Sequence, residues 1–278
     1  MNIAIIGLGI IGGSIAKALR VHTTHPVFGL NRTKATLDNA LKCGAINDVL
    51  KDFSDIDITF VCLHPKASVD FIKSSAESFK QDSIVVDVSG VKTAICAELN
   101  ELAAKNGFTF IGGHPMAGSE QVGFAHSSAR LIENASFILT PFDKDAPEVE
   151  TLKNLLNDIG FGEIVVTTPE NHDKMVAYTS QLPHVVAAAF VQDDGFANHR
   201  GFSAGSLKDI TRVADINENL WAELFIANQD HLAAKLEDFI VNLQKIKRMV
   251  QESDAASLKT YLKSSREIKA GDNDREND

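Results

Sequence analysis

The chain has 278 residues, enough for two domains, and its 44% hydrophobic and 23% charged residues are typical of a globular protein. A formal net charge of −10 disfavours general binding to DNA or RNA, although local cations still permit a small anionic ligand. The three cysteines form no CxxC pair, and no apolar run reaches the roughly 20 residues of a transmembrane helix. We therefore expect a cytoplasmic protein with no disulfide framework and no metal site, which binds neither nucleic acid nor membrane.

Short apolar runs alternate with amphipathic stretches through the first 168 residues. The predicted strands are Asn2–Ile6, Pro26–Leu30, Ile56–Leu63, Ile84–Val88, Thr109–Ile111, Ser136–Thr140 and Glu163–Val166. The helical patterns between them cover about Gly12–Val21, Thr33–Cys43, Ala67–Ser78, Val91–Lys105 and Pro147–Ile159. This alternation predicts an α/β fold with a doubly wound parallel sheet of Rossmann type.

The pattern changes at Thr168, and no convincing strand follows it. Thr168 is suited to cap a helix whose first turn holds Pro169, and Pro183 is expected to kink that helix. We therefore expect an α/β domain at residues 1–168 and an all-α domain at 169–263; the motifs below and the resemblance they carry imply a dinucleotide-binding role for the first and a substrate and dimerisation role for the second.

A second long helix is predicted over about Asn217–Gln251. Apolar residues recur in it every seven positions, at Phe225, Leu232, Phe239 and Ile246, with a second row at Leu236, Leu243 and Val250. Such a seam suits packing against another helix, either within this chain or from a second subunit. The polar stretch 264–278 is expected to be a disordered tail.

A glycine-rich loop directly follows the first predicted strand and opens a helix. Its residues are Gly7, Leu8, Gly9, Ile10, Ile11 and Gly12, which form a GxGxxG motif. The three glycines are typical of a tight turn, a close approach of backbone to pyrophosphate, and close packing of helix on strand. The helix N-terminus adds free amides for the phosphates, so the loop predicts a dinucleotide site.

The end of the second predicted strand carries Asn31, Arg32 and Thr33, where an NAD-binding protein usually has an acidic residue for the ribose. No carboxylate is present there to repel a 2′-phosphate, and Arg32 has the charge to pair with one. The alternative is that Arg32 stacks on adenine or faces solvent. These residues favour NADP, or use of both NAD and NADP.

Four further polar segments lie beyond predicted strands or in the helical region. They are DVSGVK at Asp87–Lys92, GGHPMAGSE at Gly112–Glu120, SQLPH at Ser180–His184 and KDITRVAD at Lys208–Asp215. Together with the glycine loop, in this order and spacing, they resemble the prephenate/arogenate dehydrogenase family, the oxidoreductases of tyrosine biosynthesis. The resemblance covers nearly the whole chain.

The resemblance implies a Rossmann domain followed by a helical domain that forms a homodimer. It implies the NAD(P)-dependent oxidative decarboxylation of prephenate to 4-hydroxyphenylpyruvate, with arogenate as the alternative substrate. It also implies that His114 is the catalytic histidine, which accepts a hydrogen bond from the substrate's 4-hydroxyl. An imidazole suits this role because its ordinary pKa of about 6.5 leaves it largely neutral near pH 7.

The other site residues implied by the resemblance bind substrate. Arg212 matches the arginine that holds a carboxylate, and His184 with Gln181 one turn away is expected to face the cleft. Lys208 adds positive charge as a helper, and Trp221 is expected to wall the site or pack between domains. Relatives often carry a serine where this chain has Gly90, so Ser89 is assigned to the substrate's hydroxyl in its place.

Two other classes of function compete with this interpretation. A β-hydroxyacid dehydrogenase shares the plan of a Rossmann domain plus helices, but relies on a catalytic lysine and lacks the GGHPMAG string. A non-catalytic sensor of nicotinamide redox state would need the glycine loop, but it has no use for His114, His184 and Arg212 together.

Overall fold

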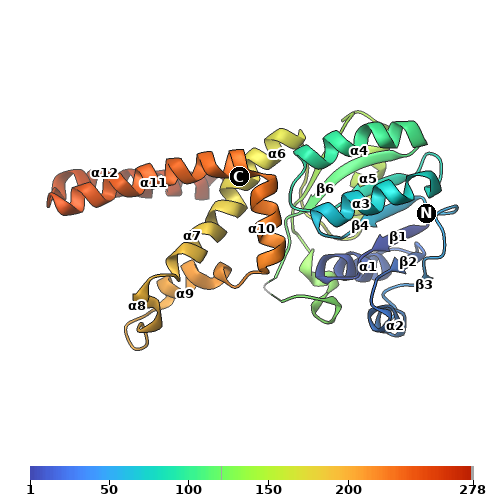
Figure 1. Cartoon of the computed structure of the whole chain (residues 1–278), viewed down its shortest axis with the longest axis horizontal. Coiled ribbons are helices and arrows are strands. Elements are labelled where there is room, and N and C mark those ends of the chain that lie inside the picture. Colours follow the sequence, from blue (N-terminus) through green and yellow to red (C-terminus); the bar gives the residue numbers. More distant parts are fainter. Residues whose placement is uncertain (120, 277–278) are drawn as a thin grey trace. The chain divides into compact units, whose positions relative to one another are not determined.

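The computed structural model describes residues 1–119 and 121–276. Within these residues, eight strands form one sheet in the order β3-β2-β1-β4-β5-β6-β7-β8 (Figure 1). They are β1 (Ile3–Ile6), β2 (Val27–Leu30), β3 (Asp48–Val49), β4 (Ile58–Val61), β5 (Ile84–Asp87), β6 (Thr109–Pro115), β7 (Phe137–Pro141) and β8 (Ile164–Val166). All seven predicted strands are therefore confirmed. The two-residue strand β3 was missed because it is too short to show a pattern.

Neighbouring strands run parallel except β6 and β7, which are antiparallel, so the prediction of a wholly parallel sheet is wrong at this pair. The physical reason lies in the connection between them. In place of a crossover helix, the described residues of this connection form two short 3-10 turns, Phe124–His126 and Ala129–Leu131. A parallel pair needs a crossover, usually helical, whereas this connection returns the chain directly alongside β6.

Helices cover both faces of the sheet. One core cluster packs α1 (Ile10–His22), α2 (Lys34–Lys42) and α5 (Pro147–Asp158) on one face. The other packs α3 (Pro65–Ser75) and α4 (Thr93–Asn106) on the opposite face (Figure 1). Strands β1, β4 and β5 are buried along their whole length, which explains why apolar residues predominate in all three.

The helical segment begins at Thr168, whose hydroxyl accepts the Asn171 amide at 3.2 Å and caps α6. Its helices are α6 (Pro169–Val176), α7 (Leu182–Phe190), α8 (Asp194–Ala197), α9 (Gly205–Thr211) and α10 (Glu218–Ala227). The irregularity expected near Pro183 is a π-helical turn, Ala177–Gln181, between α6 and α7. A π-turn of this kind is a common cause of helix kinks.

Two carboxylates of the helical segment cap helices that cover the sheet. Asp173 of α6 accepts the backbone amides of Lys92 and Thr93 at the start of α4, each at 2.8 Å. Glu223 of α10 accepts the Lys66 amide at the start of α3, at 2.5 Å. Because helix N-termini carry orphan amides and partial positive charge, these contacts fix the helical segment against the sheet layer.

The prediction of one helix over Asn217–Gln251 is wrong, because α10 and α11 (Gln229–Gln251) are separated at Asn228. The Asn228 backbone leaves helical geometry, with φ −121° and ψ 29°. Its buried side chain donates instead to the Asp173 carbonyl and to Gln181 Oε1, both at 2.8 Å.

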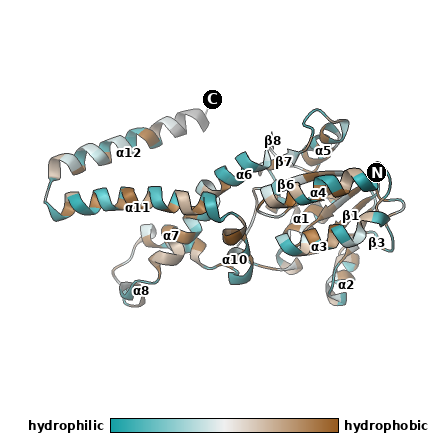
Figure 2. Ribbon diagram, turned by 45° about the horizontal axis from the view of Figure 1, so that its top comes forward, coloured by the Kyte–Doolittle hydropathy of each residue, from teal (hydrophilic) through white to brown (hydrophobic). Residues whose placement is uncertain are grey.

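The chain divides into two compact units after Gln229, so the predicted boundary at 168 falls inside the first unit. The second unit contains α11 and α12 (Ala255–Glu276). The expected disordered tail is therefore helical as far as Glu276, and its last two residues lie outside the described part of the chain. Brown and teal residues alternate along α11 in Figure 2.

No helix in the described ranges is long and apolar enough to cross a membrane.

Candidate active site

The glycine loop between β1 and α1 is shaped by glycines that no other residue can replace without strain. Gly7 adopts a left-handed φ of +91°, and a Cβ there would lie 2.5 Å from the Cys62 carbonyl oxygen. A Cβ on Gly12 would lie 2.0 Å from the Gly7 carbonyl oxygen, so α1 packs directly on the loop.

At Gly9, by contrast, an added Cβ would meet nothing within 4 Å, so the backbone is open to a ligand there. Gly9 is also the N-cap of α1, where no side chain caps the helix and no acidic residue occupies the first turn. The uncapped helix N-terminus and the open backbone fit the phosphates of a dinucleotide.

Asn31 supports the loop from the end of β2. Its Oδ1 accepts the Leu8 amide at 3.1 Å, and its Nδ2 donates to the Thr33 carbonyl at 3.3 Å. Thr33 is the N-cap of α2, and Arg32 between them is exposed. Asn31 thus contacts the glycine loop, and Arg32 and Thr33 directly follow it in the chain. Their contact with a ribose stays a prediction.

His114 is carried past the end of the parallel strands. Strand β5 pairs with β6 only as far as Gly112, and β6 continues through His114 as the antiparallel partner of β7. Both preceding glycines are required by crowding. A Cβ on Gly112 would lie 2.3 Å from Thr140 Oγ1, and one on Gly113 would lie 2.8 Å from the Phe137 ring. The Gly-Gly-His sequence therefore places an imidazole at the rim of a tightly packed sheet.

His114, His172 and Asp173 form a hydrogen-bonded chain that we call the histidine cluster. His114 Nδ1 lies 2.8 Å from His172 Nε2, and His172 Nδ1 lies 2.7 Å from Asp173 Oδ1. His172 and Asp173 are buried, whereas His114 is partly exposed. A Cβ added to Gly90 would lie 3.8 Å from His114 Nε2. The free edge of the His114 ring therefore lies beside a residue that has no side chain.

Burial and charge keep the cluster's histidines neutral. Burial lowers the pKa of His114 well below 6.5, and the neighbouring His172 and Lys92 lower it further. Burial also lowers the pKa of His172, although its hydrogen bond to Asp173 opposes that shift. Burial alone would raise the pKa of Asp173, but hydrogen bonds from His172 and Thr93 bring it below 3.8. At neutral pH the cluster is therefore two neutral rings ending on a carboxylate.

A fully buried ion pair lies beneath the cluster. Lys92 Nζ contacts Asp87 Oδ2, and neither side chain is exposed. The Ser89 hydroxyl donates to the same carboxylate oxygen at 2.8 Å, so this side chain is engaged with Asp87. Whether Ser89 also contacts a substrate, as the sequence suggested, stays a prediction. In the described part of the chain, no group of three or more His, Cys, Asp or Glu residues is placed to hold a metal ion.

Gln181 is buried and engaged at both ends of its amide. Its Nε2 donates to the Leu224 carbonyl at 3.2 Å, and its Oε1 accepts from Asn228 at 2.8 Å. It therefore joins the π-turn to α10. Its expected contact with a substrate beside His184 stays a prediction.

His184 stacks on Trp221, with ring centroids 3.7 Å apart and an angle of 26° between the planes. Its Nδ1 lies 2.8 Å from the Ser180 carbonyl oxygen, so that nitrogen is the donor. Trp221 also packs against the core cluster beneath α10. The pair forms a flat aromatic surface on the helical segment.

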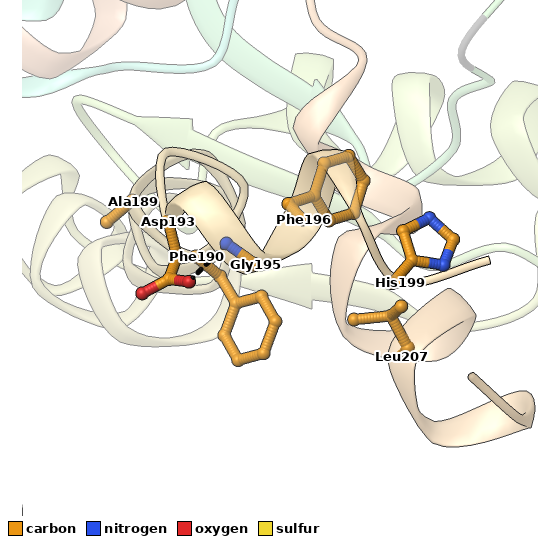
Figure 3. A pocket seen from close by; sticks show the side chains of 7 residues that line it. All are labelled: Ala189, Phe190, Asp193, Gly195, Phe196, His199 and Leu207. Atoms are coloured by element: carbon orange, nitrogen blue, oxygen red, sulfur yellow. Dashed lines mark hydrogen bonds between the residues drawn. The ribbon is translucent and has the colours of Figure 1, made fainter. Parts of the chain in front are cut away.

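Lys208 in α9 and Arg212 in the following 3-10 turn (Arg212–Ala214) are exposed and lie one helical turn apart. A separate hollow of about 430 Å³ is lined by Ala189, Phe190, Asp193, Gly195, Phe196, His199 and Leu207 (Figure 3). Neither the histidine cluster nor the glycine loop lines it, so it is not part of the site described here.

Sequence reasoning missed His172, Asp173, Asn228 and the Asp87–Lys92 pair. The two residues of α6 fall on a helix whose pattern indicated only packing. A signal was nevertheless present at α4: its N-cap is Lys92, which has no side-chain acceptor. A helix without its own cap needs an acceptor from elsewhere, and Asp173 supplies it.

The comparisons with known proteins cover both parts of the chain. Residues 15–166 match the family model of the prephenate dehydrogenase nucleotide-binding domain, and residues 168–264 match that of the prephenate dehydrogenase dimerization domain. The prephenate dehydrogenase of Bacillus subtilis (strain 168) is 31% identical over 97% of this chain and 76% of its own length.

Two solved structures are similar over their full length. The arogenate dehydrogenase of Synechocystis matches with a TM-score of 0.82, at 29% identity over 99% of each chain. The prephenate dehydrogenase of Aquifex aeolicus, solved with hydroxyphenyl propionate and NAD+, matches with a TM-score of 0.87, at 27% identity over 98% of each chain.

A Rossmann-like sheet with an open glycine loop, and a neutral histidine at its rim, define an NAD(P)-dependent dehydrogenase. The chain belongs to the prephenate dehydrogenase family.

Proposed function

We propose that this protein catalyses the oxidative decarboxylation of prephenate to 4-hydroxyphenylpyruvate, in the biosynthesis of tyrosine. The observation that carries the proposal is the position of His114 at the rim of the sheet, where Nδ1 is hydrogen-bonded to His172 and the Nε2 edge borders Gly90. A second candidate substrate is arogenate, because the arogenate dehydrogenase of Synechocystis is as similar to this chain as the prephenate dehydrogenases are.

In the proposed reaction, His114 Nε2 accepts the proton of the substrate's 4-hydroxyl. The hydride leaves the ring carbon that bears this hydroxyl, the C–C bond to the ring carboxylate breaks, and its electron pair completes the aromatic ring as CO₂ departs. NAD(P)+, when bound at the glycine loop, would supply the nicotinamide that accepts this hydride. His114 can return the proton to the phenolate oxygen, so atoms and charge balance without a further acid.

The substrate's carboxylates need cations and hydrogen-bond donors. We assign Arg212 to one carboxylate, because its planar guanidinium binds carboxylates in a bidentate manner. Lys208, one turn away, adds positive charge. His184, held against Trp221, is the proposed contact from α7.

Cofactor preference between NAD and NADP follows from the residues after β2. Asn31 replaces the usual carboxylate and Arg32 is exposed beside it, which supports NADP or use of both. The NAD+ in the A. aeolicus structure supports NAD for that relative.

We further propose a cytoplasmic homodimer formed through the C-terminal helices. Support comes from the family model of a dimerization domain, and from exposed apolar side chains on α11 and α12, among them Leu243, Val250 and Ile268. The three cysteines are free, which suits a reducing compartment. Light scattering on the purified protein tests the dimer, and a monomeric mass would contradict it.

The first experiment is an assay of the purified protein with prephenate or arogenate, each with NAD+ or NADP+, followed by the absorbance of the reduced nicotinamide. Turnover with prephenate supports the proposal, and turnover with arogenate alone supports the second candidate. Dinucleotide binding without turnover in all four mixtures favours a non-catalytic redox sensor.

His114→Ala tests the catalytic assignment. We expect kcat to fall by about 10²–10⁴, because this is the usual contribution of general acid–base catalysis. Binding of the dinucleotide, measured by calorimetry, should stay within about twofold, since the glycine loop is untouched. Near-normal turnover of the variant would refute the role of His114.

A further inference from the structure

The donor and the acceptor of each hydrogen bond in the histidine cluster can be assigned, and the assignment begins at Asp173. Its carboxylate can only accept, since the pKa of Asp173 is held below its ordinary value. It accepts from the Lys92 and Thr93 amides at 2.8 Å each. The third partner, His172 Nδ1 at 2.7 Å, must therefore carry its proton and donate it as well.

The proton on His172 Nδ1 fixes the rest of the chain. Burial lowers the pKa of His172, so the ring is neutral and its Nε2 is left as an acceptor. The atom facing Nε2, at 2.8 Å, is His114 Nδ1, which must therefore carry the proton of its own ring. His114 Nε2, which faces Gly90, is then the nitrogen with the free electron pair.

We infer that His172 and Asp173 are positioning residues that hold His114 in the tautomer with Nδ1 protonated and Nε2 free to take the substrate's proton. The inference rests on the proposed function for the identity of the substrate, but the tautomer itself is a property of the protein alone. Without a hydrogen-bond acceptor at residue 172, no partner would favour the Nδ1–H tautomer of His114 over the Nε2–H tautomer. A large share of the molecules would then present an N–H to the substrate hydroxyl where a base is needed.

The far end of the cluster is anchored independently of His114. The Asp173 side chain binds the first two amides of α4, and its backbone carbonyl accepts from Asn228 at 2.8 Å. Asn228 in turn is bound to Gln181. Asp173 is thus fixed through both its side chain and its backbone carbonyl, so the direction of the hydrogen bonds does not depend on a bound ligand.

The experiment compares two substitutions of similar size, of which only one supplies a strong hydrogen-bond acceptor. In His172→Gln the amide oxygen can take the place of Nε2 and accept from His114. In His172→Met the side chain fills similar space without a strong acceptor. We expect His172→Met to lower kcat by at least about tenfold with the KM for prephenate within about twofold, and His172→Gln to restore most of that turnover.

Nitrogen NMR of His114 gives a readout that does not need activity. The substrate-free wild type should show the proton on Nδ1, His172→Gln should keep it there, and His172→Met should shift His114 toward the Nε2–H form. Asn171→Met, an exposed position on the same helical turn, is the control that should leave both turnover and tautomer as in the wild type.

The outcomes separate this inference from the proposed function. If no substrate turns over in the wild type, the proposed function fails, and the tautomer measurement still decides the inference. The inference is overturned if wild-type His114 carries its proton on Nε2. It is also overturned if His172→Met turns over as fast as His172→Gln, with both folded by circular dichroism.

Discussion

The glycine loop and the histidine cluster are built in opposite ways. The loop is six consecutive residues, and its shape depends on backbone that lacks side chains at Gly7 and Gly12. The cluster consists of side chains from β6 and α6, and the two histidines are 58 residues apart in sequence. Its last contact, to the Thr93 amide, spans 80 residues.

This difference determines which kind of substitution disrupts each region. A loop made of backbone is disturbed by added atoms, through steric conflict. A cluster of buried polar groups is disturbed by lost partners, because a buried charge or donor without a partner is costly.

Lys92→Met should cause the largest loss of stability. Lys92 and Asp87 are both fully buried, and the substitution leaves the Asp87 carboxylate without its cation. Removing one partner of a buried pair costs about 3–5 kcal/mol, so we expect a loss of that size in the free energy of unfolding. Urea unfolding followed by circular dichroism measures it.

Lys73→Met is the matched control. Its pair with Glu98 is about half exposed, with relative exposures of 46% and 45% for the two side chains. Exposed pairs contribute at most about 1 kcal/mol, so this variant should stay close to the wild type. If the two variants lose equal amounts of unfolding free energy, the contribution of the Lys92–Asp87 pair to stability does not come from its burial.

Gly12→Ala and Gly9→Ala test the loop as a matched pair. The Gly12 Cβ would lie 2.0 Å from backbone, whereas the Gly9 Cβ would meet no atom within 4 Å. Gly12→Ala should lower stability by about 1–3 kcal/mol, the usual cost of overpacking, and weaken dinucleotide binding as well. Gly9→Ala should weaken binding by about tenfold at unchanged stability, because its methyl group fills only the space for pyrophosphate.

Thermal unfolding and calorimetric titration with NAD+ and NADP+ separate the two effects. If Gly9→Ala binds both dinucleotides as tightly as the wild type, the open backbone at Gly9 is not where the pyrophosphate approaches.

The same contrast explains how much could be predicted from the sequence. The strands and the glycine loop were predictable because their signals are local: consecutive apolar residues at Ile84, Val85 and Val86, and glycines at fixed spacing directly after β1. His114 and its neighbours were found through motifs that are also short and continuous.

The cluster's second half could not be predicted, because its signals are shared between distant segments. His172 has the spacing of a packing residue on an amphipathic helix, and nothing local shows that its neighbour Asp173 caps α4. Likewise, the end of α10 at Asn228 follows from tertiary hydrogen bonds to α6 and the π-turn, so the apolar periodicity of the sequence continues through it.

The pH dependence of stability should report the neutral histidines. In the unfolded chain these rings titrate near 6.5, while in the folded protein burial lowers the pKa of both His114 and His172. The unfolded chain therefore binds more protons just below pH 6.5. Stability from this source is fully present above pH 6.5 and is lost as pH falls through 6.5 toward the folded pKa values.

The expected slope is about 1.4 kcal/mol per pH unit for each histidine in that window. The groups that face His114 act in both directions: Lys92 and His172 oppose its protonation, and Asp173 favours it. His114→Gln should reduce the slope of the unfolding free energy against pH by about 1.4 kcal/mol per pH unit, which is the contribution of one proton. An unchanged slope would mean that His114 does not titrate between the two states as described.

Ser89→Ala should have the smallest effect, and it separates two views of this residue. The hydroxyl of Ser89 donates to Asp87 at 2.8 Å, and Asp87 keeps Lys92 when that hydroxyl is removed. We expect a loss of about 1 kcal/mol in stability and a KM for prephenate within about twofold of the wild type. Ser83→Ala, which removes a buried hydroxyl bonded to the Lys80 carbonyl at 2.6 Å, is the control for stability alone. A rise of about tenfold in KM for Ser89→Ala but not for Ser83→Ala would mean that the hydroxyl turns to the substrate. In that case the buried ion pair and the substrate would share one hydroxyl, and the corner beneath His114 would have to rearrange on binding.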